Sequence, residues 1–499
     1  MTFRSNIAEA GPAKALRNKW PQAKYTPQCK WIFQKNVLMT VLKIFLRIFA
    51  KLFLYLKNFN RFSTGFDMGA ILLKNIKVAG RGDGEVDILI DGGLIMKITP
   101  AAQHAEETGA GGCTAPDGAE VVDGKGKVAV PGFVNMHTHA AMSLMRGMGE
   151  DVVFHDWLKK IWEMESHVDA EYVYWGTKVA CIEMAKTGTT SFFDHYWFLP
   201  SARKAAEEAG VRPVLSYVML DKFDRQAAMR QRSECEDIYR QSLDWGWGKF
   251  AVGIHSIYSV SRETILWTAD FARSHGLKIH IHLCETEREV RDCIREHGVT
   301  PVRYAEDLGL LGPDVVAAHT LWLTPEDTGI LGKRKVSCVH NINSNLKLAS
   351  GYRFPYSELK EAGANVCIGT DGCASSNNLD ILEAMKTAAM VQKAWRADPT
   401  AMPLDELLAM ATSNGADALG TGAGRIEEGR TADLMIVDTD STFFLSPGSF
   451  LANFIYSAHS DCIDSVICGG RFIMRGRRIP GEEEVIRGAR EVLSRVKLM

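Results

Sequence analysis

From Met68 onward, hydrophobic and polar residues alternate in short runs that are typical of β-strands. These runs are separated by glycine and aspartate turns and cover residues 71–80, 86–100 and 127–136. After Pro131 the pattern changes, because short apolar runs now alternate with helical stretches such as 171–188 and 201–210. This repeated order of strand and helix indicates parallel strands joined by helical crossovers.

The region after Pro131 contains enough strand–helix units for a closed barrel. After the strand near residue 136, further strand candidates lie at residues 189–198, 211–220, 250–259, 277–283, 315–320, 336–341 and 364–372. About eight units fit a (β/α)8 barrel, which typically takes about 250 residues plus insertions. β-type sequence returns after Gly424, in residues 424–438 and 464–479. We therefore expect an α/β fold, a TIM-type (β/α)8 barrel with a composite β-sandwich formed by the segments before and after the barrel.

The expected organisation of the 499 residues has four parts. They are an N-terminal extension (1–67), the first part of the sandwich (68–130), the barrel (131–424) and the second part of the sandwich (425–499). A chain of this length fits two or three compact units, because single cores stop growing at about 250–300 residues.

Charge separates the extension from the rest of the chain. Residues 1–66 hold twelve Lys and Arg and one acid, whereas the remainder holds 46 Lys and Arg against 59 Asp and Glu. Residues 37–56 are mostly apolar, with Lys43, Arg47 and Lys51 on one helical stripe. This pattern is typical of a helix that lies on a membrane surface, or of a poorly formed membrane anchor, since three cations inside a span are costly. Alternatively, residues 1–67 are not part of the functional protein, which then starts at Met68. Membrane contact through 37–56 stays open, and no nucleic-acid partner is expected.

The eleven cysteines are scattered and form no Cys-x-x-Cys pair. This usage favours a reducing compartment, so a cytoplasmic location is expected. It also excludes the Pro-Cys-x-x-Cys signature of the zinc deaminases that act on nucleic-acid bases.

Polar residues stand at the ends of several predicted barrel strands. Active sites of such barrels lie where the carboxyl ends of the strands meet. His137 and His139 end the first strand, two residues apart, so both rings face the same side. His282 and Asp371 end two later strands. Three imidazoles and a carboxylate suit zinc, and we predict His137, His139, His282 and Asp371 as metal ligands.

A hydrolytic metal site also needs groups that carry protons. Metal-bound water has a pKa near 7 and requires a base, while the leaving group requires an acid. Asp371 is the expected base, and His319, at the end of the strand after His282, is placed to hydrogen-bond the water. Glu285, three residues after His282, is the expected acid for a substrate ring.

These motifs resemble the metal-dependent amidohydrolase superfamily, over residues 68–499. The closest likeness is to 5′-methylthioadenosine/S-adenosylhomocysteine deaminases and 5′-deoxyadenosine deaminases, carried by NMHTHAAMSLMRG, GIHSIYSVS, HLCETEREV, SNLKLASG and GTDGCASSNNLD. The resemblance implies one divalent ion and proton transfer by Glu285 and Asp371. It also implies that Glu165 holds the ribose hydroxyls and that His255 contacts the substrate. HNINSN departs from the commoner His-Asn-Pro-x-Ser-Asn, and the spacing to Glu165 is one residue short.

The expected function is hydrolytic deamination of the adenine ring in 5′-modified adenosines, including S-adenosylhomocysteine, 5′-methylthioadenosine, 5′-deoxyadenosine and adenosine. The expected cofactor is one divalent ion, zinc, and the expected partner is a small nucleoside. An alternative is another amidohydrolase, such as a guanine or s-triazine deaminase or chlorohydrolase, because fold and metal do not decide the substrate. A non-catalytic relative would be expected to lack the metal ligands, and all of them are present in this sequence. The sequence does not determine whether the protein forms a homo-oligomer.

Overall fold

The computed structural model describes residues 69–82, 84–101 and 113–496. The chain divides into two compact units, residues 1–66 and 67–499. The predictions on the N-terminal extension, including membrane contact through residues 37–56, lie outside the described residues. Among the helices that are described, none has both the length and the apolar character needed to cross a membrane.

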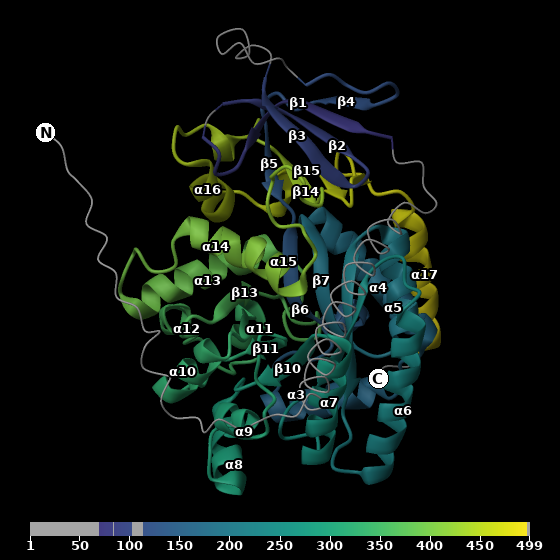
Figure 1. Cartoon of the computed structure of the whole chain (residues 1–499), viewed down its shortest axis with the longest axis vertical. Coiled ribbons are helices and arrows are strands. Elements are labelled where there is room, and N and C mark those ends of the chain that lie inside the picture. The colour runs from purple at the N-terminus through teal and green to yellow at the C-terminus, as the bar shows by residue number, and fades with distance from the viewer. Residues whose placement is uncertain (1–68, 83, 102–112, 497–499) are drawn as a thin grey trace, which may run out of the picture. The chain divides into compact units, whose positions relative to one another are not determined.

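The segments before and after the barrel build one sheet, which is visible at the top of Figure 1. In order across the sheet, its strands are β16 (Arg471–Met474), β15 (Ile463–Cys468), β14 (Leu434–Asp438), β5 (Lys127–Pro131), β1 (Ile71–Val78), β2 (Val86–Asp91) and β3 (Leu94–Pro100), with β4 (Glu120–Asp123) paired to β1. The two halves meet where β14 runs antiparallel to β5. Buried Ile, Leu and Val side chains from both halves share one core, so neither half is complete alone.

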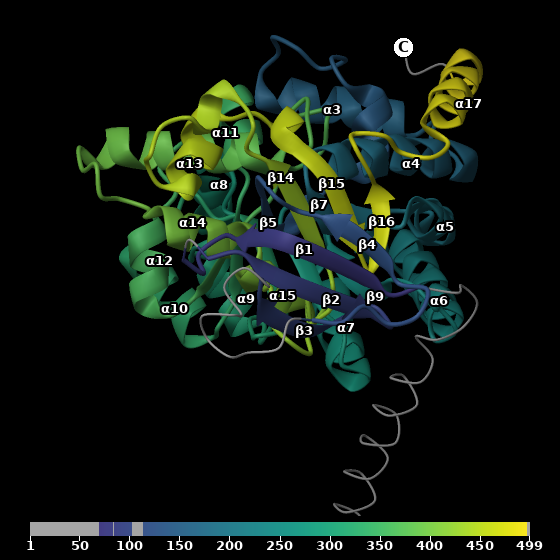
Figure 2. The same ribbon diagram turned by 90° about the horizontal axis from the view of Figure 1, so that it is seen from above.

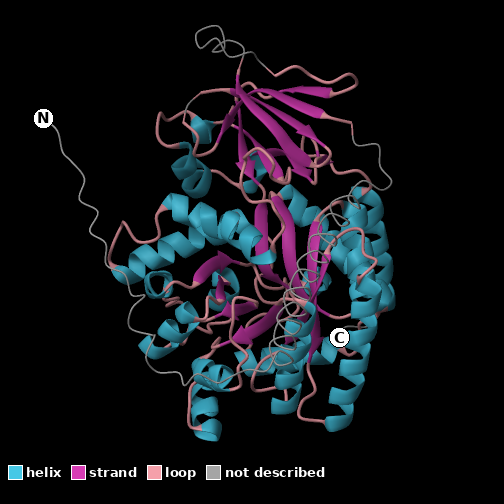
Figure 3. Cartoon of the chain, in the orientation of Figure 1, coloured by secondary structure: helices cyan, strands magenta, loops and turns pink. Residues whose placement is uncertain are grey.

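The second sheet consists of eight parallel strands, and helices cover its outside (Figure 3). The strands are β6 (Phe133–Thr138), β7 (Thr189–Tyr196), β8 (Arg212–Met219), β9 (Lys249–Ile254), β10 (Ile279–Leu283), β11 (Val315–His319), β12 (Ser337–His340) and β13 (Asn365–Ile368). Neighbours in this list pair in parallel. They match the strands expected from the sequence.

The helices that follow the strands form the outer layer of the barrel (Figure 2). They are α4 (Ala170–Lys186), α5 (Leu199–Ala209), α6 (Arg225–Ser242), α7 (Arg262–His275), α8 (Glu287–His297), α9 (Pro301–Asp307), α10 (Pro325–Lys333), α12 (Tyr356–Ala362), α13 (Ile381–Arg396) and α14 (Leu404–Ala411), whereas α15 (Ser413–Leu419) packs against the barrel interior. Most begin at a Ser, Thr or Asp whose side chain accepts a backbone N–H, which is the usual N-cap.

Side chains fasten the last barrel strand to the first. Asn135 Nδ2 donates to Thr370 Oγ1 at 2.7 Å, and the Thr370 amide donates to Asn135 Oδ1 at 3.1 Å. Gly132 separates β5 from β6, and a Cβ there would lie 2.4 Å from Thr190 Cγ2, so this close approach requires glycine. The expected fold, a (β/α)8 barrel with a composite β-domain, is confirmed.

The barrel interior is filled in layers. Its lower layer is apolar and packs against α15, with side chains that include Val134, Phe193, Val214, Ala251, Val316, Val339 and Cys367. Toward the carboxyl ends of the strands the interior becomes polar. On β10, for example, His280 and His282 are buried, while the alternating residues Ile279, Ile281 and Leu283 pack in the outer core. The polar groups therefore lie on top of a closely packed apolar layer.

Three helical elements described next have no counterpart in the expected strand–helix units. The connection after β6 forms η1 (Ala140–Met145) and α3 (Phe154–Glu165) before α4 begins. The segment expected as the second part of the sandwich also contains α17 (Glu482–Arg495), which packs on α4. A Cβ at Gly488 of α17 would lie 2.4 Å from the ring of Trp175, so the two helices approach closely.

Candidate functional site

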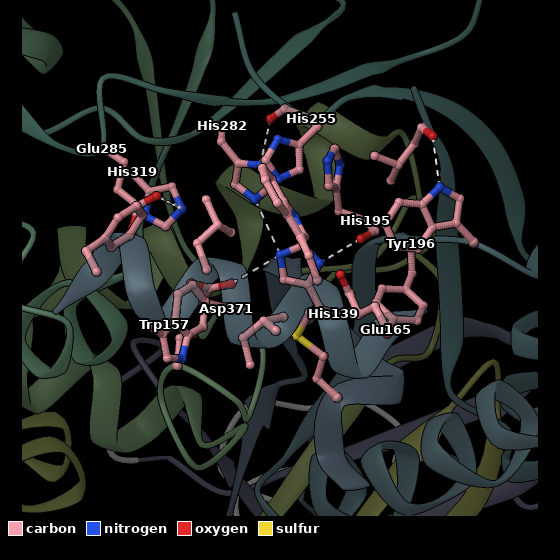
Figure 4. Close-up of a pocket in the computed structure, with 18 of the residues that line it drawn as sticks. His139, Trp157, Glu165, His195, Tyr196, His255, His282, Glu285, His319 and Asp371 are labelled. Carbon is pink, nitrogen blue, oxygen red and sulfur yellow. Dashed lines mark hydrogen bonds and ion pairs between the residues drawn. The ribbon is translucent and has the colours of Figure 1, made fainter. Parts of the chain in front are cut away.

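A pocket opens at the carboxyl ends of the barrel strands (Figure 4). Its walls come from η1, α3 and the loops after most of the strands. Of the predicted site residues, His139, Glu165, His255, His282, Glu285, His319 and Asp371 line it directly. His137 lies beneath them and is fully buried. The structure therefore brings together every residue that the sequence singled out.

The predicted metal ligands converge on one point. The Nε2 atoms of His137 and His139 each lie 3.3 Å from Asp371 Oδ1. His282 Nε2 lies 3.3 Å from His139 Nε2. His137 Nε2 is completely buried and has no well-formed hydrogen bond to any described residue. A buried nitrogen lone pair that faces other acceptors is unfavourable unless a cation lies between them, so the donor set fits a metal ion.

Hydrogen bonds orient the imidazoles toward that point. His139 Nδ1 donates to the carbonyl oxygen of His195 at 2.7 Å, and His282 Nδ1 donates to the carbonyl oxygen of His255 at 2.7 Å. Because a carbonyl oxygen only accepts, each Nδ1 carries the proton and each Nε2 keeps its lone pair. Burial lowers the pKa of His282 well below its usual range, which keeps the ring neutral, as metal ligation requires.

Asp371 is held as a carboxylate. Burial raises its pKa, but the adjacent imidazoles of His137 and His139 outweigh this effect and keep the pKa well below the usual range. Its Oδ2 accepts a hydrogen bond from Ser344 Oγ at 2.7 Å, and its Oδ1 accepts from the Gly372 amide at 2.8 Å. Its φ of 66° is in the left-handed region, a strain that such sites retain where geometry is demanding.

Glu285 has the opposite character. Burial and the nearby carboxylates of Asp371 and Glu289 raise its pKa well above the usual range, which favours its protonated form. Glu289 of α8 fixes its backbone, because Glu289 Oε2 accepts from the Glu285 amide at 2.8 Å and Oε1 accepts from the Cys284 amide at 2.9 Å. Glu285 Oε2 lies 3.7 Å from His319 Nε2. The pocket thus contains one carboxyl group whose pKa is raised, Glu285, and one whose pKa is lowered, Asp371.

His319 is positioned by the segment that departs from the family pattern. Asn345 Nδ2 lies 2.9 Å and Asn341 Nδ2 3.4 Å from His319 Nδ1, which leaves Nε2 facing the pocket. These asparagines and Ser344 belong to HNINSN, on β12 and α11 (Ile342–Lys347). Ile342, in place of the commoner proline, is buried and packs in the core.

The outer part of the pocket is aromatic and contains Glu165. This residue ends α3, and burial raises its pKa to about 7, an effect that His139 and Tyr196 partly offset. His255 Nδ1 lies 2.7 Å from Ser259 Oγ, so Nε2 is available to a ligand. The rings of Trp162 and His255 are 5.8 Å apart. A carboxylate, an imidazole and aromatic faces suit a ligand with hydroxyl groups and a planar ring.

Several lining residues were not anticipated from the sequence. They are Met142, Phe154, Trp157, Leu158, Ile161, Trp162, His195, Tyr196, Trp197, Val218, Tyr258 and Ser375. His195 and Tyr196 end a strand in DHYW, so the strand-end rule could have identified them. The α3 residues carried no such signal, because an amphipathic helix has the same sequence pattern whether its apolar face packs on a core or lines a pocket.

Comparisons with known proteins agree with this geometry. The family model described as "Amidohydrolase family" matches residues 128–473. A 5′-deoxyadenosine deaminase of Methanoregula boonei is 43% identical, over 86% of this chain and 95% of that protein. A 5-methylthioadenosine/S-adenosylhomocysteine deaminase of Archaeoglobus fulgidus is 38% identical, over 85% of this chain and 99% of that protein.

Solved structures show the same architecture. An adenosine deaminase from Xanthomonas campestris with bound zinc superimposes with a TM-score of 0.79 at 29% identity, covering 86% of this chain and 98% of that one. The atrazine chlorohydrolase TrzN from Arthrobacter aurescens, complexed with zinc, gives 0.75 at 22% identity, covering 85% and 100%. The second likeness supports the fold alone. Taken together, the family model and the relatives show that this chain belongs to the metal-dependent amidohydrolase family.

Proposed function

We propose that this protein hydrolytically deaminates the adenine ring of 5′-modified adenosines and uses one divalent ion, zinc, held by His137, His139, His282 and Asp371. The observation that carries the proposal is that Glu285, Asp371 and His319 line one pocket beside the donor set, with Glu285 Oε2 3.7 Å from His319 Nε2. This chain covers nearly the whole length of two relatives that are named 5′-deoxyadenosine deaminase and 5-methylthioadenosine/S-adenosylhomocysteine deaminase.

The chain supplies both proton transfers that the reaction needs. A metal ion at the donor set would lower the pKa of a bound water to near 7. Asp371 accepts the proton of the attacking water, and His319 Nε2 hydrogen-bonds that water. Glu285 donates its proton to a ring nitrogen, so C6 accepts the new C–O bond. Asp371 then returns the proton to the amino group, and the C–N bond breaks to release ammonia. The remaining hydroxyl proton returns to Glu285 as the C6 carbonyl of the inosine-type product forms.

The outer pocket supports a nucleoside rather than a free base. Glu165 is a single carboxylate in an otherwise aromatic wall, and a carboxylate accepts two hydroxyl donors, as a ribose 2′,3′-diol provides. His255 Nε2 is available to donate to a purine nitrogen. A guanine or triazine ring would leave Glu165 without a partner, so the alternative substrates give this residue no role.

The first experiment uses the full chain loaded with one equivalent of zinc. S-Adenosylhomocysteine, 5′-methylthioadenosine, 5′-deoxyadenosine, adenosine and adenine are each followed by the absorbance change from adenine to hypoxanthine. We expect turnover of the nucleosides but not of adenine, and its loss in Glu285→Gln. Glu287→Gln is the matched control, because Glu287 is an exposed carboxylate two residues along. Zinc-loaded protein that turns over none of the nucleosides would overturn the proposal.

A further inference from the structure

A buried chain of polar side chains lies below the donor set, inside the barrel. His280 precedes the ligand His282 by two residues on β10, so both face the interior. His280 Nε2 lies 2.9 Å from Nδ1 of His137. On its other side, His280 Nδ1 lies 3.5 Å from Ser216 Oγ, and Ser216 Oγ donates to the carbonyl oxygen of Asp194 at 2.6 Å. The side chains of His137, His280 and Ser216 are fully buried.

The carbonyl at the end of this chain determines the direction of every hydrogen bond. The Asp194 carbonyl only accepts, so the Ser216 hydroxyl proton points toward it. Ser216 Oγ therefore accepts from its other neighbours, His280 Nδ1 and, at 3.4 Å, His195 Nδ1. With its proton on Nδ1, His280 presents the Nε2 lone pair to His137. His137 then donates from Nδ1, which leaves its Nε2 lone pair pointing at the donor set.

Close packing holds His280 in this position. The rings of Phe193 and His280 stack with centroids 4.1 Å apart. Gly253 of β9 faces the same layer, and a Cβ there would lie 2.8 Å from Cε1 of His195. The layer is therefore too tightly filled for the rings to rotate freely, and the hydrogen-bond chain has one arrangement.

His137 differs from the other two imidazole ligands in how it is oriented. His139 and His282 donate to backbone carbonyls, which every residue type would supply. His137 alone depends on a side chain. We propose that His280 and Ser216 are positioning residues, which fix the tautomer and orientation of His137 and thereby set the affinity of the site for its metal. The proposal rests on the metal site of the proposed function but not on the identity of the substrate.

The test compares variants of His280 in the full chain by zinc affinity, measured by competition with a chromogenic chelator. Outer-shell partners of metal ligands are typically worth about 10–100-fold in metal affinity. We expect a loss of this size in His280→Leu, which removes the acceptor. His280→Gln places an amide oxygen near the position of Nε2, so it should recover most of the affinity. Ser216→Ala should weaken binding by several-fold, because His280 Nδ1 loses its acceptor.

A matched control separates hydrogen bonding from packing. His340 is also a fully buried histidine on a barrel strand, it stacks on Phe354, and its ring nitrogens have no hydrogen-bond partner among the described residues. His340→Leu should keep zinc affinity within about two-fold. The visible absorption of Co²⁺-loaded protein adds a signature of ligand geometry, expected to change in His280→Leu and not in His340→Leu.

Two results would overturn the inference. One is a zinc affinity of His280→Leu within two-fold of wild type. The other is an equal loss in His280→Leu and His280→Gln, since packing would then explain the effect. If His280→Leu fails to fold, His280→Gln and Ser216→Ala provide the test instead. An unchanged zinc affinity in Ser216→Ala would contradict the proposed role of the hydrogen bond between His280 and Ser216. Tight zinc binding without deamination would contradict the proposed function and leave this inference standing.

Discussion

The backbone amide of Asp371 donates to the carbonyl oxygen of His137 at 2.9 Å. This bond joins the end of the last barrel strand to the first, and both residues belong to the donor set. Barrel closure and the metal site therefore share the same two residues. A change that loosens the seam between β6 and β13 should disturb both stability and metal binding.

Substitution of Asn135 tests that link. Asn135→Ala removes both side-chain hydrogen bonds to Thr370 and leaves the buried Thr370 amide unpaired, while the Thr370 hydroxyl still donates to the carbonyl oxygen of Asp371. An unpaired buried group costs about 1–3 kcal/mol, so we expect a loss of roughly 2 kcal/mol in the free energy of unfolding, measured in urea. Zinc affinity should fall as well. Thr370→Ser, which keeps the hydroxyl, is the control, and an equal loss there would argue against the hydrogen bonds.

Glu285 is expected to act as an acid and not as a ligand. Glu285→Gln cannot donate the proton, and general acid catalysis is typically worth about 10²–10⁴-fold, so kcat should fall by that range. Zinc content, measured by atomic absorption, should stay at one equivalent. A variant that lost its zinc together with its activity would show that Glu285 supports the metal site instead.

Glu165 should make stability depend on pH. Its folded pKa of about 7 exceeds the ordinary value of 4.5, so the folded state binds more protons than the unfolded state between these values. Its contribution is therefore present below pH 4.5 and is lost as pH rises through about 7. The Tm difference between Glu165→Gln and wild type should shift in favour of the variant from pH 5 to pH 8. A pH-independent difference would contradict the raised pKa.

Glu165 should also discriminate between substrates. Glu165→Ala removes the proposed acceptor of the ribose hydroxyls, and a hydrogen bond to a charged group contributes about 1.5–3 kcal/mol. We expect kcat/KM for 5′-methylthioadenosine and adenosine to fall at least ten-fold. If steady-state kinetics show no change, Glu165 does not bind the ribose hydroxyls.

A buried ion pair connects the barrel to the β-domain and is expected to stabilise the fold. Arg212 at the start of β8 donates from Nε and Nη2 to Asp433, both at 3.2 Å, and Asp433 also accepts from the Gly469 amide. Asp433 is 1% exposed, so Asp433→Ala leaves an unpaired buried guanidinium and should cost about 3–5 kcal/mol in urea unfolding.

The surface pair of Lys127 and Asp464 provides the comparison for that variant. These side chains are 27% and 24% exposed, and solvent screens their attraction. Asp464→Asn should therefore change the free energy of unfolding by less than about 1 kcal/mol. Similar effects in the two variants would mean that burial of the Arg212 pair contributes little.

The sequence by itself determined the order of the strands and the residues at their ends. Strand alternation and glycine punctuation are local signals, and a barrel places all strand ends at one mouth, so His137, His139, His282, His319 and Asp371 could be identified without coordinates. Glu285 followed from its spacing to His282. Each of these inferences needed only neighbouring residues and one rule of topology.

The tertiary structure alone decided which side chains support those residues. Asn135 meets Thr370, Asn345 meets His319, and His280 meets both His137 and Ser216, although these partners are far apart in the chain. Such contacts depend on strand register and on which side of each strand faces the interior, and no local pattern encodes them. For the same reason the packing partner of α17 could not be predicted. Its amphipathic sequence predicts a helix but does not determine which surface the helix covers.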